Sequence, residues 1–210
     1  ETTRSFSDLG KGKKIFFDKR SLEEKYKKDL TLRGEHNLEN IAAAVETAKL
    51  VGIPEGVIAD TVRNFKGLEH RLEFVADVGG VRYYNDSFAT GPQPTIAAIN
   101  SFTEDETIIL GGSDKGLDYT GLRKVIEEKE NVKNLILIGD IGEKIGGGIS
   151  GKNIINLGHT TMLRIIEAAR EVTKPGGVVI LSPAAASFDM FKDYKERGEK
   201  FKEAVASLPR

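Results

Sequence analysis

The apolar positions follow a helical period before residue 68 and alternate between strand and helix periods after it. From Asn37 onward, apolar side chains recur at i, i+3 and i+4, which predicts an amphipathic helix carrying Leu38, Ile41, Ala42, Val45 and Ala48. The stretch 51–54, with its glycine and proline, ends this helix, and residues 57–65 predict a second, shorter one. Nearer the start, residues 14–17 form a short strand candidate.

After residue 68 the chain alternates strands and helices. The predicted strands are 72–78, 81–85, 107–111, 135–139, 154–157 and 178–182, and the predicted helices are 93–102, 120–130, 160–172 and 190–208. Gly79 and Gly80 separate the first two strands and indicate a hairpin. Runs such as 108–110 and 178–181 are apolar throughout, which is typical of parallel strands buried on both faces. We therefore predict an α/β fold with a mostly parallel sheet and flanking helices over residues 68–210.

The first 67 residues are too short and irregular to look like a complete domain, so we place a domain boundary near Leu68.

Composition narrows the class of protein: 39% of the residues are hydrophobic, 30% are charged, and the net charge is −1. That balance is typical of an ordinary soluble globular protein and does not favour nucleic acid as a partner. The sequence has no cysteine, no transmembrane-length apolar run and no set of residues with metal-ligand spacing, so we expect neither a membrane partner nor a metal site.

Polar residues follow several predicted strands directly. In open parallel sheets, ligands bind outside the carboxyl ends of the strands. Residues 85–87 are Asn-Asp-Ser, residues 111–116 are Gly-Gly-Ser-Asp-Lys-Gly, and residues 182–187 end in Ser187. The glycine-rich segment with Lys115 suits either a phosphate-approaching loop or an ordinary βα turn. Asp86 and Ser187 could each serve only as a local cap.

Two further pairs are candidates for binding. Asn37 and Asn40 lie one helical turn apart, so their amides share a face and could meet an adenine edge or cap the helix. His70 and Arg71 sit at the expected domain boundary, where a structural ion pair is the default interpretation.

The order of these segments resembles the Mur ligases. Residues 34–44 match the Gly-x-His-Asn-x-x-Asn-x-x-Ala-Ala motif of that family, and the family's other markers follow in order at 65–73, 84–90, 111–115, 181–191 and 194–201. The resemblance covers roughly residues 30–210, and the last block is most similar to members that add D-glutamate. It implies that residues 1–67 are the α+β tail of a truncated central ATP-binding domain. Residues 68–210 would be the Rossmann-like amino-acid-binding domain.

The resemblance also implies an activity. Such enzymes are cytoplasmic, ATP- and Mg²⁺-dependent amide ligases of peptidoglycan precursor synthesis, and this one would join D-glutamate to UDP-N-acetylmuramoyl-L-alanine through an acyl phosphate. The chain has no Gly-x4-Gly-Lys-Ser/Thr loop and opens on Glu1 rather than Met. We therefore expect a C-terminal fragment that is monomeric and inactive alone, its metal ligands lying mostly elsewhere.

By resemblance, the site residues have separate roles. Arg71, Lys115 and His70 are expected to be catalytic, with Arg71 on the terminal phosphate, Lys115 beside the acyl phosphate or amino-acid carboxylate and His70 near the substrate amine. The nucleotide would be bound by Asn37, Asn40, Arg71 and Asp86, and the amino acid by Thr90, Lys115, Ser187, Phe188 and Tyr194.

Phe88 departs from the family pattern, because many members that add D-glutamate have a lysine there. A ring cannot pair with a carboxylate, so another cation compensates or the amino acid differs. Two alternatives therefore stay open. One is another amide ligase of the superfamily, with a different amino acid or a folate-like acceptor. The other is a non-catalytic module that binds a nucleotide or an amino acid.

Overall fold

The computed structural model describes residues 9–209 and divides the chain into two compact units. Unit 1 is Glu1–Phe65 and unit 2 is Lys66–Arg210, so the division falls two residues before the expected boundary. Residues 1–8 of the expected first domain lie outside the described residues. Within residues 9–209, no helix is long and apolar enough to cross a membrane.

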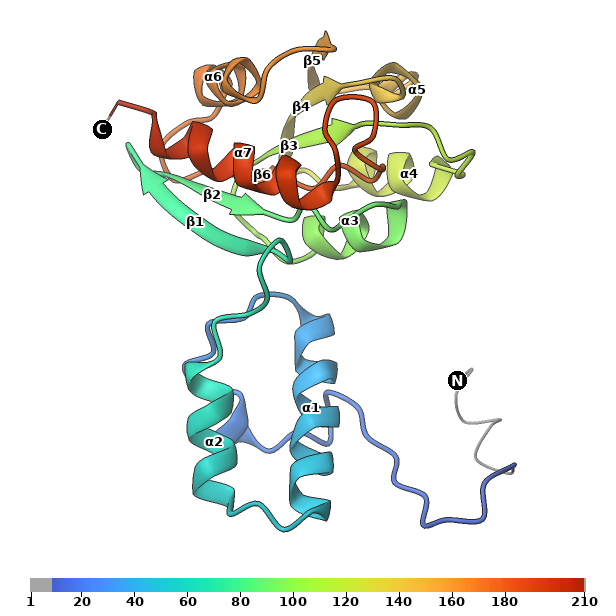
Figure 1. Cartoon of the computed structure of the whole chain (residues 1–210), viewed down its shortest axis with the longest axis vertical. Coiled ribbons are helices and arrows are strands. Elements are labelled where there is room, and N and C mark those ends of the chain that lie inside the picture. Colours follow the sequence, from blue (N-terminus) through green and yellow to red (C-terminus); the bar gives the residue numbers. More distant parts are fainter. Residues whose placement is uncertain (1–8, 210) are drawn as a thin grey trace. The chain divides into compact units, whose positions relative to one another are not determined.

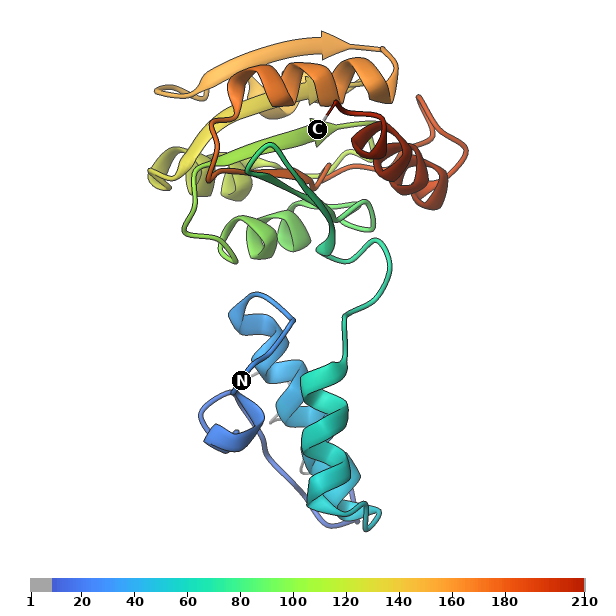
Figure 2. The same ribbon diagram turned by 90° about the vertical axis from the view of Figure 1, so that its left-hand side faces the viewer.

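Unit 1 is a pair of helices with a short helical turn beside it. Its elements are η2 (Glu24–Tyr26), α1 (Glu35–Leu50) and α2 (Glu55–Asn64), and α1 and α2 lie side by side (Figure 1 and Figure 2). Tyr26, Ile41, Val45 and Ile58 are buried together between them. The strand predicted at residues 14–17 was wrong: this segment has no regular structure, because no neighbouring strand is available to pair its backbone groups.

Unit 2 is built on a six-stranded sheet. Its elements are β1 (Glu73–Val78), β2 (Val81–Asn85), α3 (Pro92–Ile99), β3 (Glu106–Gly111), α4 (Thr120–Glu128), β4 (Val132–Ile138), α5 (Gly142–Gly146), β5 (Asn153–Gly158), α6 (Met162–Val172), β6 (Val178–Leu181) and α7 (Tyr194–Ala206). The strand order is β1-β2-β6-β3-β4-β5. Strand β1 is antiparallel to β2, as the hairpin predicted, and all other pairs are parallel. The α/β fold predicted from the sequence is confirmed.

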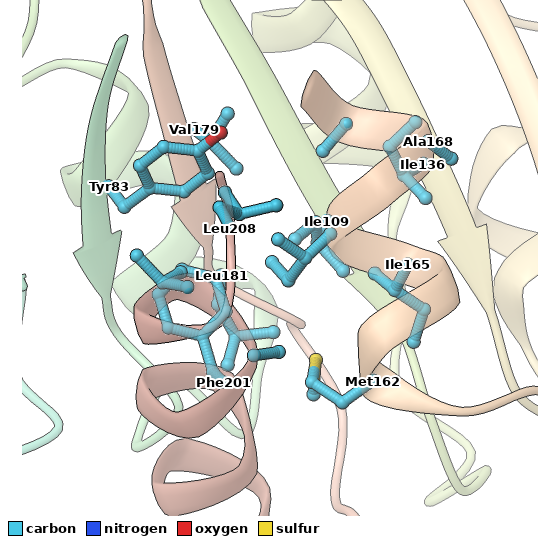
Figure 3. Packing of buried hydrophobic residues seen from close by; sticks show 14 of the residues in the cluster. Tyr83, Ile109, Ile136, Met162, Ile165, Ala168, Val179, Leu181, Phe201 and Leu208 are labelled. Atoms are coloured by element: carbon cyan, nitrogen blue, oxygen red, sulfur yellow. The ribbon is translucent and has the colours of Figure 1, made fainter. Parts of the chain in front are cut away.

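Helices cover both faces of this sheet (Figure 1). On one face, α6 and α7 pack against β-strand residues such as Tyr83, Ile109 and Val179, and Figure 3 shows Met162, Ile165 and Phe201 reaching into this cluster. On the other face, α3, α4 and α5 bury Leu122, Ile126 and Ile145 against the alternate strand residues. The apolar runs are thus shared between two cores, because successive strand side chains point to opposite faces.

Two helices differ from the predictions. The last helix begins at Tyr194 and not at Met190, because the Asp193 carboxylate accepts a hydrogen bond from the backbone N–H of Glu196 at 2.9 Å and caps the helix. The five-residue helix α5, which ends at Gly146, was not predicted.

The strand order brings three loops together. Strand β6 lies between β2 and β3, so the chain reverses its direction of winding across this part of the sheet. All three strands are parallel, and the loops at 86–90, 112–116 and 182–188 therefore leave the same edge.

At the opposite edge, burial of Glu106 generates a prediction about stability. The side chain is fully buried at the start of β3, Asn131 Nδ2 donates to its Oε1 at 2.6 Å, and its Oε2 has no hydrogen-bond partner. Burial raises the pKa of this carboxyl to about 8. The folded state therefore keeps the proton across a window in which the unfolded chain loses it. This contribution to stability is present below about pH 4.5 and is lost as the pH rises to about 8.

We expect Glu106→Gln to keep the bond to Asn131 and to remove this loss. At pH 9 the variant should be more stable than the parent chain by roughly 1–3 kcal/mol, measured by urea denaturation, because no buried charge forms. Asp105→Asn, at an exposed neighbouring carboxylate, is the control and should leave the pH profile unchanged. A parent chain whose stability is flat between pH 5 and 9 would contradict this assignment.

Candidate functional site

The candidate site lies where the loops after β2, β3 and β6 meet, and a buried arginine joins two of them. Arg197 on α7 is 1% exposed. Its Nε donates to Ser87 Oγ at 2.9 Å and its Nη2 to the carbonyl of Ser87 at 2.8 Å. The same guanidinium donates to the carbonyls of Ala185 at 3.1 Å and Ala186 at 3.3 Å. Arg197 therefore fixes the loop after β2 against the loop after β6.

The environment of Arg197 explains how its charge is tolerated. Burial lowers the pKa of this guanidinium to about 10, while the negative charges of Asp189 and Asp86 oppose that effect. The group thus stays charged at neutral pH, and its donors meet fixed oxygen atoms rather than water.

Asp86 stands at the end of β2 and is turned inward. It is 8% exposed, and its two oxygens accept from the backbone N–H of Leu72 at 3.1 Å and from Ser182 Oγ at 2.7 Å. Burial raises the pKa of its carboxyl to about 7, against the opposing effects of these hydrogen bonds and of Arg71 and Arg197. Asp86 does not cap its own turn; it connects β2 to β6 and to the segment that precedes β1.

His70 is also enclosed, at 4% exposed. The Asn85 amide nitrogen lies 2.9 Å from its Nδ1, and Glu199 Oε1 lies 3.7 Å from its Nε2. An amide N–H donates, so Nδ1 accepts and the proton of the neutral ring is on Nε2, toward Glu199. Gly198 permits this approach, because a Cβ there would come within 2.3 Å of His70 Nδ1. The predicted place of His70 near the substrate amine stays a prediction.

The residue after His70 is exposed and carries an uncommitted charge. Carbon ζ of Arg71 lies 4.2 Å from the centre of the Phe88 ring, and Phe88 meets Tyr194 edge to face at 4.8 Å. Among residues 9–209, Arg71 forms no ion pair. Tyr194 also meets the His70 ring edge to face at 5.8 Å. Four of the predicted site residues thus lie close to Phe88 and the adjoining residues of its loop. They are His70, Arg71, Asp86 and Tyr194.

Lys115 lies on the loop after β3, which is tied to the loop after β6. The backbone N–H of Ser113 donates to the carbonyl of Ala186 at 2.9 Å, and the Ser113 hydroxyl lies 3.2 Å from Asp189 Oδ1. Asp114 pairs with Lys144 at 2.8 Å, whereas Lys115 is exposed and has no ion pair within the described part of the chain. Lys115 is therefore a second cation available to an anion.

The first two glycines of this loop have a packing role. Added Cβ atoms would come within 1.8 Å of the Ile138 carbonyl oxygen at Gly111 and within 2.0 Å of the Ala186 carbonyl oxygen at Gly112. Both residues also have positive φ angles, 124° and 140°. Close approach to neighbouring backbone is enough to account for these two glycines.

The remaining predicted amino-acid ligands lie on the same loops. Thr90 is half-buried, and its backbone N–H donates to the carbonyl of Phe88 at 2.8 Å. Ser187 is buried, and its carbonyl accepts from the backbone N–H of Phe191 at 2.8 Å, so it shapes a turn and does not cap α7. Phe188 is 70% exposed.

Asn37 and Asn40 belong to unit 1. Their amides share a face of α1, as the spacing predicted, because Asn40 Nδ2 lies 3.2 Å from Asn37 Oδ1. Asn37 Nδ2 also donates to the carbonyl of Arg33 at 2.8 Å and so ties the preceding turn to the helix. The contacts of these amides with a nucleotide stay predictions.

Sequence analysis missed Arg197, Asn85 and Asp189, which hold the site together. A signal for Arg197 was present: it lies four residues before Phe201 and eight before Val205, on the apolar stripe of α7. A charged residue on a buried stripe needs fixed partners. One partner, Ser87, lies 110 residues away in sequence, and no local pattern identifies it, whereas Ala185 and Ala186 lie 12 and 11 residues before Arg197.

Among residues 9–209, no group of three ligand residues offers the all-oxygen donor set that Mg²⁺ prefers. Two groups have ligand atoms close enough to hold a metal ion, Glu69, His70 and Glu199, and Asp140, His159 and Asp189. Each includes an imidazole, whereas Mg²⁺ prefers oxygen ligands. In the second group, Asp189 Oδ2 already accepts from the backbone N–H of Asp140 at 3.0 Å.

We expect Arg197→Met to destabilise unit 2 by about 3–5 kcal/mol, because three carbonyl oxygens and two carboxylates lose their buried partner. Urea denaturation followed by circular dichroism measures the change. Arg164→Met, at an exposed arginine on α6, is the matched control and should change stability by less than about 1 kcal/mol. Equal losses in the two variants would show that the buried bonds contribute no more than a surface ion pair.

Comparison with known proteins finds sequences similar to this one. No family model matches the sequence. The chain is 45% identical over 181 residues to the UDP-N-acetylmuramoylalanine–D-glutamate ligase of Pelotomaculum thermopropionicum, covering 86% of this chain and 39% of that protein. It is 43% identical over 187 residues to the enzyme of that name from Thermoanaerobacter sp. strain X514, covering 87% and 40%. The chain thus spans about two fifths of the length of the curated relatives it matches.

Solved structures share the fold at low sequence identity. The UDP-N-acetylmuramate-alanine ligase of Thermotoga maritima superposes with a TM-score of 0.61 at 16% identity, over 85% of this chain and 39% of that one. The MurF ligase of Thermotoga maritima, solved in complex with ADP, gives a TM-score of 0.57 at 16% identity, over 83% and 39%. The chain is thus similar in sequence to D-glutamate ligases over most of its own length, and it shares the fold of two further ligases, MurC and MurF.

Proposed function

We propose that this chain is the amino-acid-binding part of an ATP-dependent ligase that adds D-glutamate to UDP-N-acetylmuramoyl-L-alanine. The observation that carries the proposal is the 45% identity to a D-glutamate ligase over 86% of the chain. The whole enzyme would act in peptidoglycan precursor synthesis in the cytoplasm. Unit 1 would complete its nucleotide-binding domain, with Asn37 and Asn40 facing the nucleotide.

The reaction has two steps that this part of the enzyme would serve. The carboxylate of the acceptor attacks the terminal phosphorus of ATP and gives an acyl phosphate and ADP. The amine of D-glutamate then attacks the acyl carbon, loses a proton, and expels inorganic phosphate as the amide forms. Negative charge gathers on the transferred phosphoryl group and on the tetrahedral oxygen, and fixed cations stabilise such charge.

Arg71 and Lys115 are the residues of this chain suited to that role. Both are exposed and free of ion pairs among residues 9–209, and both lie on loops whose backbones are fixed by buried hydrogen bonds. A cation held in place before the reaction stabilises developing charge without reorganising. The amino acid would be held by residues on the same edge of the sheet, Thr90, Ser187, Phe188 and Tyr194. Asp86 would help to bind the nucleotide.

A chimeric enzyme tests the proposal. In it, this chain replaces the matching 181 residues of the Pelotomaculum thermopropionicum ligase. With ATP, Mg²⁺ and UDP-N-acetylmuramoyl-L-alanine, we expect ADP release to require D-glutamate, among a panel of D- and L-amino acids. The isolated chain should release no ADP, because its sequence has no phosphate-binding loop. Turnover with a different amino acid would overturn the D-glutamate assignment, and a folded chimera that binds ATP without any turnover would overturn the ligase assignment.

Lys115→Ala in the same chimera should lower turnover by about tenfold or more, because one preorganised charge is lost. Lys124→Ala, at an exposed lysine of α4 that faces Glu128 at 3.8 Å, is the matched control and should leave turnover unchanged. An unaltered rate in Lys115→Ala would remove this residue from the reaction.

A further inference from the structure

We propose that the ring of Phe88 positions the guanidinium of Arg71 as an oxyanion-binding group at the carboxyl end of β2. Carbon ζ of Arg71 lies 4.2 Å from the centre of that ring, within the range of a cation–π contact. Such a contact holds the cation without neutralising it, unlike a carboxylate partner. Phe88 is thus a positioning residue. Its ring holds the guanidinium in place and leaves the positive charge available, whereas a salt bridge would neutralise that charge.

The backbone that carries Arg71 is fixed in a strained conformation. Its two neighbours, His70 and Leu72, have positive φ angles of 62° and 47°. Such angles are costly for residues with a Cβ and persist only where surrounding contacts enforce them. Here the backbone N–H of His70 donates to Glu73 Oε2 at 2.9 Å, and that of Leu72 donates to Asp86 Oδ1 at 3.1 Å. The start of the Arg71 side chain is therefore held from both sides.

Phe88 is tied to the same segment. Its backbone N–H donates to the carbonyl of His70 at 3.0 Å, so the ring and the arginine keep their relative register. The ring meets Tyr194 edge to face, with an interplanar angle of 83°. Tyr194 is in turn fixed through its carbonyl, which accepts from Ser87 Oγ at 2.7 Å. These contacts leave the Phe88 ring a defined orientation in which to meet the guanidinium.

This geometry decides the class of ligand. The guanidinium lies over the ring, which offers no oxygen atom to its N–H donors, so the contact leaves those donors available to a ligand. A planar set of donors with a full positive charge matches the oxygens of a carboxylate or a phosphate. Carboxylates and phosphates both take part in the proposed reaction. The inference rests on the proposed function only for the identity of this ligand.

The Arg71 Nε–Hε resonance of the ¹⁵N-labelled 210-residue chain reports the contact directly. It is assigned by its absence in Arg71→Lys and is followed during titration with inorganic phosphate in one arm and with D-glutamate in another. We expect at least one of the two to shift it. Phe88→Leu should move the resonance toward that of a solvated arginine and weaken the affinity for the binding anion by about three- to tenfold. Phe88→Tyr, which keeps the ring, should retain the resonance position and the affinity.

Phe74→Leu is the matched control, because Phe74 is an exposed ring that meets Tyr84 and not an arginine. It should leave the resonance and the affinity unchanged. The inference is overturned if Phe88→Leu alters neither, if Phe74→Leu alters both equally, or if neither anion shifts Arg71 in the parent chain. The arm that responds identifies the oxyanion. Because this readout needs no turnover, it can fail while the chimeric ligase works, and it can succeed where the chimera releases no ADP.

Discussion

The site depends on one constraint: a fully buried guanidinium must find oxygen partners for its donors. Arg197 finds them in the Ser87 hydroxyl and in the carbonyls of Ser87, Ala185 and Ala186, which belong to loops far apart in the sequence. A flexible pair of loops could not satisfy a buried charge, because each lost bond leaves that charge without compensation. The loops that carry Phe88, Thr90, Ser187 and Phe188 therefore have fixed backbones before any ligand arrives.

A second set of bonds extends this constraint to the segment before β1. Asp86 faces inward from the same loop as Ser87, and its carboxylate holds the backbone of Leu72 in a left-handed conformation. The loop that Arg197 fixes thus also fixes the backbone beside Arg71. Arg197 and Asp86 together fix the backbone position from which the exposed Arg71 side chain extends. The buried hydrogen bonds of unit 2 are therefore connected to its charged edge.

The sequence predicted what depends on local period and on the ends of strands. The alternation of 3.6- and 2-residue periods located nearly all the elements of unit 2, and the apolar runs at 108–110 and 178–181 indicated central strands, which they are. Reading the polar residues after each strand also located the loops at 86–90, 112–116 and 182–188.

The misses share a physical cause, since each depends on partners that are distant in sequence. The strand expected at residues 14–17 has no neighbouring strand among residues 9–209, and the bond between Arg197 and Ser87 spans 110 residues. Composition alone did not decide the role of Gly111 and Gly112. Their sequence suits a phosphate loop equally well, and only the approach of Ile138 and Ala186 shows that packing requires them.

The charged residues of unit 2 fall into two groups. Some are buried and stabilise the loops, and others are exposed and available to a ligand. Arg197 and Asp86 are buried, and the negative charges of Asp86 and of the partly buried Asp189 partly offset the cost of burying the guanidinium. Arg71 and Lys115 stand outside this group, exposed and unpaired among residues 9–209, at the edge where β2 and β3 end.

The whole chain has a net charge of only −1, so attraction of anions to this edge cannot come from overall charge. Local cations such as Arg71 and Lys115 can supply this attraction where neighbouring carboxylates do not pair with them. Asp86 is bonded to Leu72 and Ser182, and Asp114 to Lys144, and among residues 9–209 neither forms an ion pair with Arg71 or Lys115, although burial raises the pKa of Asp86 and the charge of Arg71 opposes that rise. The buried polar network thus holds the site in shape and also keeps its cations free for an anion.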